Sequence, residues 1–464
     1  MVTLSSIADK ISGIRFMIDN LDVRSALGKK HLQTTAFCTD TEKLAKDADS
    51  IYDITVLLDK EDFKHRFSHI RNRFEQLRDI ERSLQHLAKA GVPDDIELYE
   101  IKHFCLLVSE IRDLLGEQTF NDLQLPDLED AINILDPENQ RIPHFYIYPS
   151  YHPELSALRK KLSSIDNADK DAFAILYGRC AEIEDKIRVE LSHQLIEYAD
   201  KMLEALHNTA RLDILFAKAL QAKSLLLCKP VVAHEITTYK GLFNPQVKAI
   251  LAANHKQFQA VDIDLHPGPC VVTGANMAGK TVLLRTIALA QYLFQFGFFI
   301  PATEAHIVPV ELVMNSVGDQ QSELQGLSSF ASEMLNINGI LKAAKSNKQI
   351  LALIDEPART TNPAEGLAIA NAVIDELAGH KVRSVITTHY SGITGGVRKL
   401  KVVGLKTELL PETISPENIN DFIDYSLTEN TEGTVPAEAI RIATLLGIDE
   451  ELLEKAKCYI SRKT

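Results

Sequence analysis

The chain has 464 residues, 45% of them hydrophobic and 25% charged, and its formal net charge is −14. This length and apolar content suit a globular protein of two or three domains, and the acidic balance gives no general attraction for nucleic-acid phosphates. The apolar stretch near residues 289–300 is too short and too polar to span a bilayer, and the N-terminus lacks a secretory signal, so neither membrane anchoring nor export is expected.

The cysteines bear on the cellular compartment. The six thiols are scattered along the chain without CxxC or metal-ligand spacing. Such cysteines are more often reduced and buried than paired in disulfides. We therefore expect a cytoplasmic protein.

Residues 1–230 contain few glycines and long periodic segments, so helices are expected to dominate them. The run 171–222 is predicted to be one very long helix, either a structural lever or a helix that spans the core. Apolar residues recur along it at spacings of three to four or their multiples, which gives one stripe: Ile175, Ile183, Ile187, Leu191, Leu195, Met202, Leu206 and Leu215.

A connector rich in proline and tyrosine, from residue 135 to residue 162, interrupts the helical segments and is expected to include a short hairpin or extended segment. Its aromatic residues are either packed inside the connector or form a platform for stacking bases, and packing is the commoner role. These residues are Phe145, Tyr146, Tyr148 and Tyr151.

The best candidate for a basic patch is the run 60–82. Its cations are either a binding surface for duplex phosphates or one solvated helix face with acidic partners at helical spacing, and the second pattern is the more common. The cations within this run include Lys64, Arg66, Arg71, Arg73 and Arg78.

The second half carries a GxxxxGKT loop in the segment VVTGANMAGKTVLLR, between a β-branched run and a helix-forming run. Glycines at 274 and 279 allow successive backbone N–H groups to wrap nucleotide phosphates. Lys280 would supply charge near the β and γ oxygens and Thr281 a hydroxyl for Mg²⁺. The predicted phosphate-binding residues are Gly274, Ala275, Asn276, Met277, Ala278, Gly279, Lys280 and Thr281.

Two further strands are predicted to deliver polar residues at their carboxyl ends, where ligands bind in open α/β sheets. In QILALIDEPARTTNPAEG, the buried strand 350–354 ends on Asp355, a second Mg²⁺ ligand, and Glu356, which would orient or deprotonate the attacking water. The strand 384–387 leads to His389, predicted to contact the γ-phosphate. Each of these residues alone would more often have a structural role. Three such motifs in this order, each at the end of a strand, favour a nucleotide hydrolase.

Between these segments lies GLSSFASEM, ahead of a helical run in which Leu335, Ile337 and Ile340 are expected on an apolar side. Ser328 is either an ordinary N-cap or a hydroxyl that reaches the γ-phosphate of a nucleotide held by a second subunit, as in ABC-type ATPases. There is no LSGGQ sequence, which argues against a transporter ATPase.

The motifs TGANMAGKT, GLSSFASEM, LIDEPARTTNPAEGLAIA and TTHY, in this order, resemble the ATPase domain of the MutS family of DNA mismatch-repair proteins. Departures from the family pattern are modest: Ala275 stands where proline is common, Ala278 where glycine is common, and Pro357 and Ala358 where Ile-Gly is typical. The resemblance of the N-terminal half is looser.

The resemblance implies an α plus α/β protein, with a helical core and lever domain at 1–230 and an ABC-type P-loop ATPase domain at 231–464 that ends in dimerisation helices. It implies ATP and Mg²⁺ as ligands and a homodimer. The segment YKGLFNPQV aligns with the family's base-side loop, so Phe243 either stacks on adenine or packs the domain junction.

Two functions remain open at this stage. Family membership favours a dimeric switch that binds mismatched or branched DNA in repair or recombination. The acidic balance, and the expected lack of the mismatch-reading and clamp domains, favour a MutS-related ATPase that remodels or reactivates a protein partner, such as an aminomutase, without binding DNA.

Overall fold

The computed structural model describes residues 2–121, 123–164, 170–275, 277–317, 329–346, 348–406, 418–431 and 439–461. By its internal contacts the chain divides into two compact units. Unit 1 comprises Met1–Leu21, Ala36–Ala48 and Gln221–Thr464, and unit 2 comprises Asp22–Thr35 and Asp49–Leu220. The described part of the chain is mixed helix and sheet, and all ten strands lie in unit 1.

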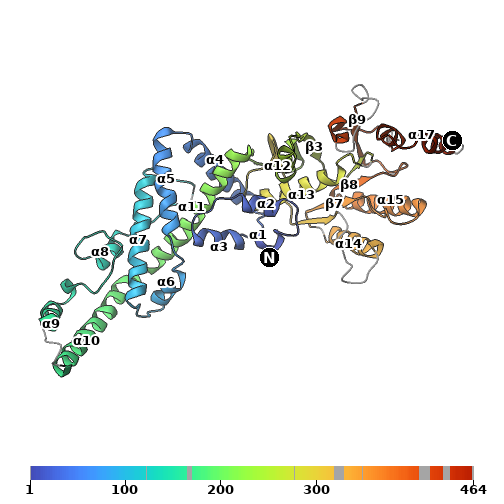
Figure 1. Ribbon diagram of the computed structural model, residues 1–464. Coiled ribbons are helices and arrows are strands. Elements are labelled where there is room, and N and C mark those ends of the chain that lie inside the picture. Colours follow the sequence, from blue (N-terminus) through green and yellow to red (C-terminus); the bar gives the residue numbers. More distant parts are fainter. Residues whose placement is uncertain are drawn as a thin grey trace. The chain divides into compact units, whose positions relative to one another are not determined.

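Unit 2 is built of helices (Figure 1). Amphipathic spacing explains them: in α5, for example, Phe63, Phe67, Ile70 and Phe74 recur every three or four residues and are all buried. The helices are α3 (Ala26–Thr34), the second half of α4 (Thr41–Leu57), α5 (Glu61–Gln76), α6 (Glu81–Ala88), α7 (Asp95–Leu115), α8 (Glu129–Leu135), α9 (Pro153–Ser164), α10 (Lys170–Leu195) and α11 (Ala199–Leu225), whose last residues belong to unit 1.

The predicted long helix is present as α10 and α11, separated by a 3-10 turn at Ile196–Tyr198. Seven of the eight stripe residues are buried. The exception is Ile175, which is 71% exposed. The apolar stripe is therefore not covered along its whole length, since periodicity shows that residues share a helix face but not how far along the helix a partner covers that face.

The aromatic residues of the connector are packed inside it, which was the commoner of the two alternatives. Phe145 and Tyr148 are buried, and the Tyr151 hydroxyl donates to the carbonyl of Ile134. Of the two expected forms, the hairpin is absent, because residues 136–152 are all described and contain no strand. Tyr148 and His152, which flank a 3-10 turn at Pro149–Tyr151, have extended backbone.

A charged pair lies at the centre of this packing. Lys102 of α7, which is fully buried, donates to Asp136 Oδ1 (3.1 Å), to the His144 carbonyl (3.0 Å) and to the Tyr148 hydroxyl (2.9 Å). The other carboxylate oxygen of Asp136 accepts the N–H of Arg141. The three ammonium protons are thus matched by three acceptors, which offsets the cost of burying the charges.

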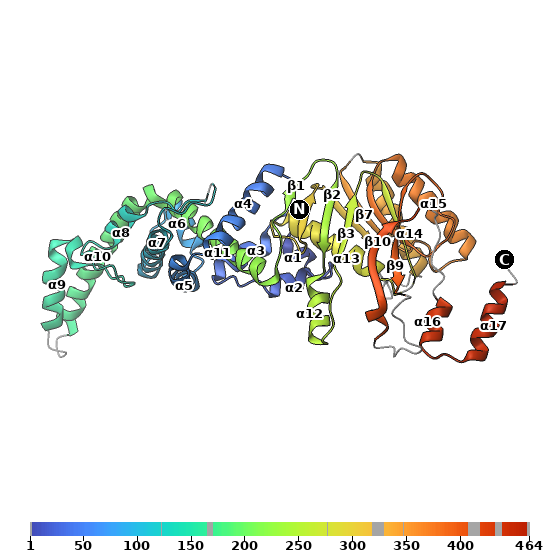
Figure 2. The same ribbon diagram turned by 90° about the horizontal axis from the view of Figure 1, so that it is seen from above.

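Unit 1 contains two sheets (Figure 2). The smaller has the order β1-β5-β2-β3, with β1 (Val231–Val232), β2 (Thr237–Leu242), β3 (Val261–Leu265) and β5 (Glu304–Ile307). The larger has the order β10-β9-β4-β8-β7-β6, with β4 (Pro269–Thr273), β6 (Leu312–Ser316), β7 (Ile350–Asp355), β8 (Arg383–Thr388), β9 (Arg398–Leu405) and β10 (Ile423–Glu429). Five of its strands run parallel, and β10 is antiparallel to β9.

Helices cover the larger sheet on both faces. Alternate residues of β7 point to opposite sides: Ile350, Ala352 and Ile354 pack in one cluster with residues of α14 (Ser329–Ala344) and α15 (Pro363–Gly379). On α14 this cluster includes Ile337 and Ile340, whereas Leu335 is 58% exposed, so its predicted place on the apolar side was wrong. Residues 350–354 of β7 are all apolar and buried, as is typical of parallel strands with both faces covered. The remaining helices of unit 1 are α1 (Leu4–Ile7), α2 (Ile14–Asp19), α12 (Pro245–Ala253), α13 (Lys280–Gln295), α16 (Ala439–Leu445) and α17 (Glu450–Ser461).

The N-terminal segments of the chain belong to unit 1, whereas the sequence suggested one boundary at residue 230. A bridge joins Thr3 to Ala36. The side chain of Gln295, at the end of α13, donates to the Cys38 carbonyl, and the Cys38 N–H donates to the Gln295 carbonyl, each across 2.9 Å. These contacts join residues too distant in sequence for periodicity to reveal.

Candidate functional site

The glycine-rich loop follows β4, in the interior of the larger sheet, and leads directly into α13. A Cβ on Gly274 would lie 3.2 Å from side-chain atoms of both Ala278 and Val402, so only glycine fits without a shift. Gly279 has a φ of +71°, and Met277 adopts a φ of +76° although it has a side chain. Asn276 lies outside the described residues. The loop is therefore sharply turned at the carboxyl end of a strand, as phosphate-binding loops are.

Lys280 is held by the loop that precedes it. Its ammonium is almost fully buried and donates to the carbonyls of Gly274 (2.8 Å) and Ala275 (3.0 Å). It also lies 3.4 Å from Glu356 Oε1. The positive charge is thus placed beside the loop backbone and beside the predicted catalytic carboxylate.

The two residues predicted to bind Mg²⁺ lie together. The Thr281 hydroxyl donates to Asp355 Oδ2 across 2.7 Å, and the Thr387 hydroxyl donates to Asp355 Oδ1. Asp355 and Thr387 lie opposite each other on neighbouring parallel strands, which brings them to the same sheet edge. A hydroxyl and a carboxylate on one side of a loop are oxygen donors of the kind that Mg²⁺ prefers.

Glu356 lies next to three basic side chains. Its carboxylate is 3.4 Å from the ammonium of Lys280, 3.6 Å from Arg359 Nη1 and 3.8 Å from His389 Nδ1. Its N–H donates to the carbonyl and hydroxyl of Thr387, and its φ is +47°. The structure thus brings Glu356, His389 and Lys280 into one cluster, whereas their catalytic roles stay predictions.

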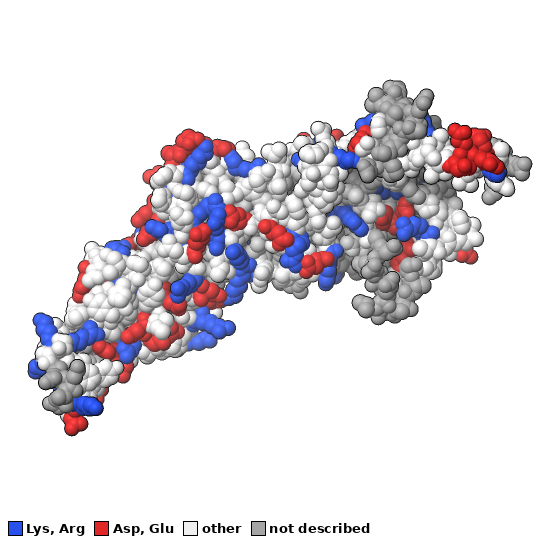
Figure 3. Space-filling model, in the orientation of Figure 1, with Lys and Arg blue, Asp and Glu red and all other residues white. Residues whose placement is uncertain are grey.

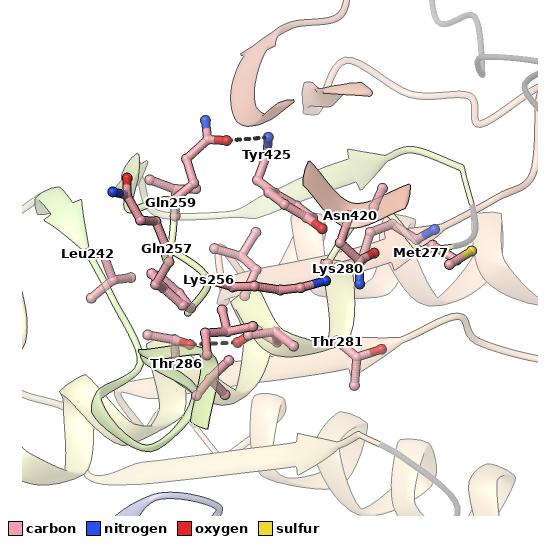
Figure 4. Close-up of a pocket in the computed structure, with 18 of the residues that line it drawn as sticks. Leu242, Lys256, Gln257, Gln259, Met277, Lys280, Thr281, Thr286, Asn420 and Tyr425 are labelled. Carbon is pink, nitrogen blue, oxygen red and sulfur yellow. Dashed lines mark hydrogen bonds between the residues drawn. The ribbon is translucent and has the colours of Figure 1, made fainter. Parts of the chain in front are cut away.

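A pocket of about 510 Å³ extends from the loop (Figure 4). Polar residues from four separate segments of unit 1 border it, among them Lys256, Gln259, Asn420 and Tyr425. Gln259 is tied to β10, because its Oε1 accepts the Tyr425 N–H (3.2 Å) and its Nε2 donates to Asp424 (2.7 Å). The apolar part of the wall is formed by Leu242, Val247, Leu251, Phe258, Val261 and Leu283.

Sequence reasoning missed Tyr425, because nothing in the local pattern of β10 indicates that it faces residues near position 279. A Cβ on Gly279 would lie 3.0 Å from a ring carbon of Tyr425. Burial raises the pKa of the Tyr425 phenol, so this hydroxyl stays protonated at neutral pH.

Phe243, predicted to stack on adenine or to pack the domain junction, does not line the pocket. Phe243 is 7% exposed, and the ammonium of Lys248 lies 4.3 Å from its ring centroid. The described residues that line the pocket include its neighbour Leu242 but not Phe243 itself. Ser328 lies outside the described residues, and α14 begins at the next position.

Comparisons with known proteins agree with this architecture. Residues 270–462 match the family model of MutS domain V. The chain is 36% identical over 292 residues to an endonuclease MutS2 from Geobacillus sp. (strain WCH70), in an alignment that covers 61% of this chain and 34% of that protein. It is 35% identical over 292 residues to the endonuclease MutS2 of Geobacillus thermodenitrificans, with 61% of this chain and 34% of that protein covered.

An endonuclease MutS2 from Caldanaerobacter subterraneus is 35% identical over 289 residues, covering 60% of this chain and 34% of the relative. The chain spans about a third of the length of the curated relatives it matches. The domain V match and these identities support membership of the MutS family.

Proposed function

We propose that this chain binds and hydrolyses ATP at the site between the glycine-rich loop and Glu356. The observation that carries the proposal is the meeting, at one sheet edge, of Lys280, the Thr281–Asp355 pair and Glu356. These groups come from the start of α13 and the end of β7, which are distant in sequence, and nucleotide hydrolysis needs their combined chemistry.

In the proposed reaction, the backbone N–H groups of residues 274–281 and the start of α13 bind the phosphates. The Lys280 ammonium exchanges its carbonyl partners for β- and γ-phosphate oxygens. Thr281 and Asp355 would hold Mg²⁺, which when bound neutralises charge on these oxygens. The carboxylate of Glu356 orients the attacking water and accepts its proton, while His389 lies on the γ-phosphate side.

The adjoining pocket is proposed to hold the nucleoside. Its apolar wall and polar border suit a flat heterocycle with a hydroxylated sugar, since ligand pockets combine apolar surface with a few oriented polar groups. Tyr425, Gln259 and Lys256 are the side chains best placed to contact that part of the ligand.

We further propose that the chain acts as a homodimer, with the helical 1–230 region as a MutS core and lever and α16–α17 as dimerisation helices. Helix α17 leaves Leu452 and Tyr459 58% and 70% exposed, which is apolar surface that a second copy would cover. Ser328 would then reach the γ-phosphate of the partner's nucleotide.

Subunit mixing tests this composite site. A dimer of one Ser328→Ala chain and one Lys280→Ala chain carries both changes at a single site and keeps the other site whole. Mixtures should therefore regain hydrolysis that neither homodimer shows. If mixtures give only the average of the two homodimers, with subunit exchange verified, Ser328 is a helix cap alone.

For the cellular role we propose a MutS-type ATPase in DNA repair or recombination, which the family and the MutS2 relatives support. A second candidate is the remodelling of a protein partner, which the distribution of charged side chains on unit 2 favours. Acidic and basic side chains alternate on the face of unit 2 drawn in Figure 3. The five cations considered for a DNA patch all lie in ion pairs: Lys64–Glu61, Arg66–Asp62, Arg71–Asp22, Arg73–Glu110 and Arg78–Glu100.

The hydrolysis rate with mismatched, branched and homoduplex DNA, over a salt series, separates the two roles. Stimulation that weakens as salt rises supports DNA as the partner, because phosphate contacts release counterions. If none of these DNAs stimulates hydrolysis, the result favours the protein-remodelling role. A location in the cytoplasm remains part of this proposal; the structure adds only that none of its described helices meets the length and apolarity needed to cross a membrane.

A further inference from the structure

The turn after Asp355 contains a residue in an unfavourable conformation. Ala358 has a φ of +58° and is fully buried, and Glu356, two residues earlier, also has a positive φ. An L-residue in the left-handed region places its Cβ against its own carbonyl, so such a conformation persists only when the surroundings hold it. Something other than the local sequence must therefore hold this turn.

Both backbone polar groups of Ala358 are bound by side chains from other elements. Its N–H donates to Glu333 Oε1 of α14 across 2.5 Å. Its carbonyl accepts the hydroxyl of Tyr390, which follows β8, across 3.0 Å. A side chain from a helix and one from a strand end thus hold the two peptide units on either side of the Ala358 Cα.

Tyr390 is itself tightly placed. Its side chain is 9% exposed, and its N–H donates to the Thr388 hydroxyl across 3.0 Å. A Cβ on Gly366 of α15 would lie 2.2 Å from the Tyr390 oxygen, so glycine at this position leaves room for the hydroxyl. Burial, together with the carboxylates of Glu333 and Glu356, raises the pKa of Tyr390, which keeps the phenol a donor at neutral pH.

We propose that Glu333 and Tyr390 are positioning residues that hold the turn at Ala358 and thereby set the place of the Glu356 carboxylate. Glu356 is two residues from Ala358, and its carboxylate lies among Lys280, Arg359 and His389. A displacement of α14 would pass through Glu333 to this turn, so the helix and the hydrolytic carboxylate are mechanically coupled. The inference rests on the proposed ATP hydrolysis and adds two residues to it.

The test compares Glu333→Ala with Glu333→Gln, because glutamine keeps an oxygen that accepts the Ala358 N–H. We expect single-turnover hydrolysis to fall about 10-fold in Glu333→Ala and in Tyr390→Phe, since misplacing a catalytic group by about 1 Å costs up to about 100-fold. Glu333→Gln should stay within about 3-fold of wild type. Affinity for a fluorescent ATP analogue should change by less than about 2-fold in all three.

A second set of variants separates positioning from general loss of structure. Adding Ala358→Gly to Glu333→Ala should recover part of the rate, because glycine adopts a φ of +58° without a Cβ penalty. Gly366→Ala should lower the rate by displacing Tyr390. Its matched control is Gly379→Ala at the end of the same helix, where a Cβ meets no heavy atom within 4 Å, and this variant should keep the wild-type rate.

Unchanged hydrolysis in Glu333→Ala and Tyr390→Phe would overturn the inference. So would equal losses of rate and affinity with no recovery by Ala358→Gly. If the wild-type chain does not hydrolyse ATP, the proposed function is wrong. The hydrogen bond between Glu333 and the Ala358 N–H can then still be tested by amide exchange. Faster exchange of the Ala358 N–H in Glu333→Ala than in Glu333→Gln supports the grip on the turn, and equal exchange refutes it.

Discussion

Thr281 and Asp355, 74 positions apart in the sequence, are joined by a hydrogen bond of 2.7 Å from the threonine hydroxyl to the carboxylate. The bond links the first residues of α13 to the end of β7. It places the two proposed Mg²⁺ ligands side by side, so they would need little rearrangement to coordinate a cation.

This pairing predicts how the affinity for nucleotide depends on Mg²⁺. Thr281→Val removes the hydroxyl at nearly constant volume and should abolish the gain in ATP-analogue affinity produced by Mg²⁺, a loss on the order of 10-fold. Thr281→Ser keeps the hydroxyl and should keep the gain. Titrations with and without Mg²⁺ measure both, and an intact Mg²⁺ effect in Thr281→Val would remove this residue from the ion site.

Glu356 and Lys280 are expected to separate hydrolysis from binding. Glu356→Ala should still bind ATP but slow single-turnover hydrolysis by about 100-fold or more, because the water loses its base. Lys280→Ala should lose affinity itself, since its ammonium no longer meets the phosphates. Undiminished single-turnover hydrolysis by Glu356→Ala would show that another group activates the water.

Phe243 and Tyr425 provide a paired test of the nucleoside contact. Tyr425 borders the pocket whereas Phe243 is buried beside Lys248, so Tyr425→Ala should weaken nucleotide binding by about 10-fold, as loss of a stacking contact does. For Phe243→Ala, a lost preference for ATP over GTP at unchanged melting temperature would support stacking on adenine. A large fall in melting temperature with the preference intact would show that Phe243 packs the fold.

The positions of these side chains also show how far the sequence could be interpreted. β-Branched and apolar runs that end in Gly274, Asp355 and His389 predicted three strands, and the structure has each of them. The local pattern was sufficient there because a parallel strand is buried on both faces, and the residues that bind ligands come directly after its carboxyl end. It did not suffice for Tyr425 or Glu333, whose partners are set by tertiary packing, nor for Ile175 and Leu335, which are exposed on helices with the expected periodicity.

The buried Lys102–Asp136 pair should dominate the stability of unit 2. Lys102→Met leaves a buried carboxylate without its cation and should lower the free energy of unfolding by about 3–5 kcal/mol. Adding Asp136→Asn removes the second charge and should restore most of the loss, because replacing both members of a buried pair is often close to neutral. Hydrogen exchange of the α7 amides measures the change, and two additive losses would show that the charges are not coupled.

The same pair predicts a response to acid. Burial alone would raise the pKa of Asp136, but the Arg141 N–H and the Lys102 ammonium outweigh it and lower that pKa. A carboxylate with a lowered folded-state pKa stabilises the fold above its unfolded pKa, and this contribution is lost as pH falls through the folded value. Unit 2 should therefore lose stability below about pH 4, near the ordinary aspartate pKa, and the Lys102→Met/Asp136→Asn variant should lose less. Identical acid profiles would contradict the assignment.

The reciprocal hydrogen bonds between Cys38 and Gln295 have a consequence for biosynthesis. Gln295 follows Cys38 by 257 residues, so the ribosome needs roughly 10 to 50 s to supply it at typical elongation rates. During that interval residues 36–48 emerge and wait while the larger segment of unit 2, residues 49–220, is made. The first segment of the chain can take its final place only late in translation, and a fragment starting at residue 231 would leave the end of α13 without its natural cover.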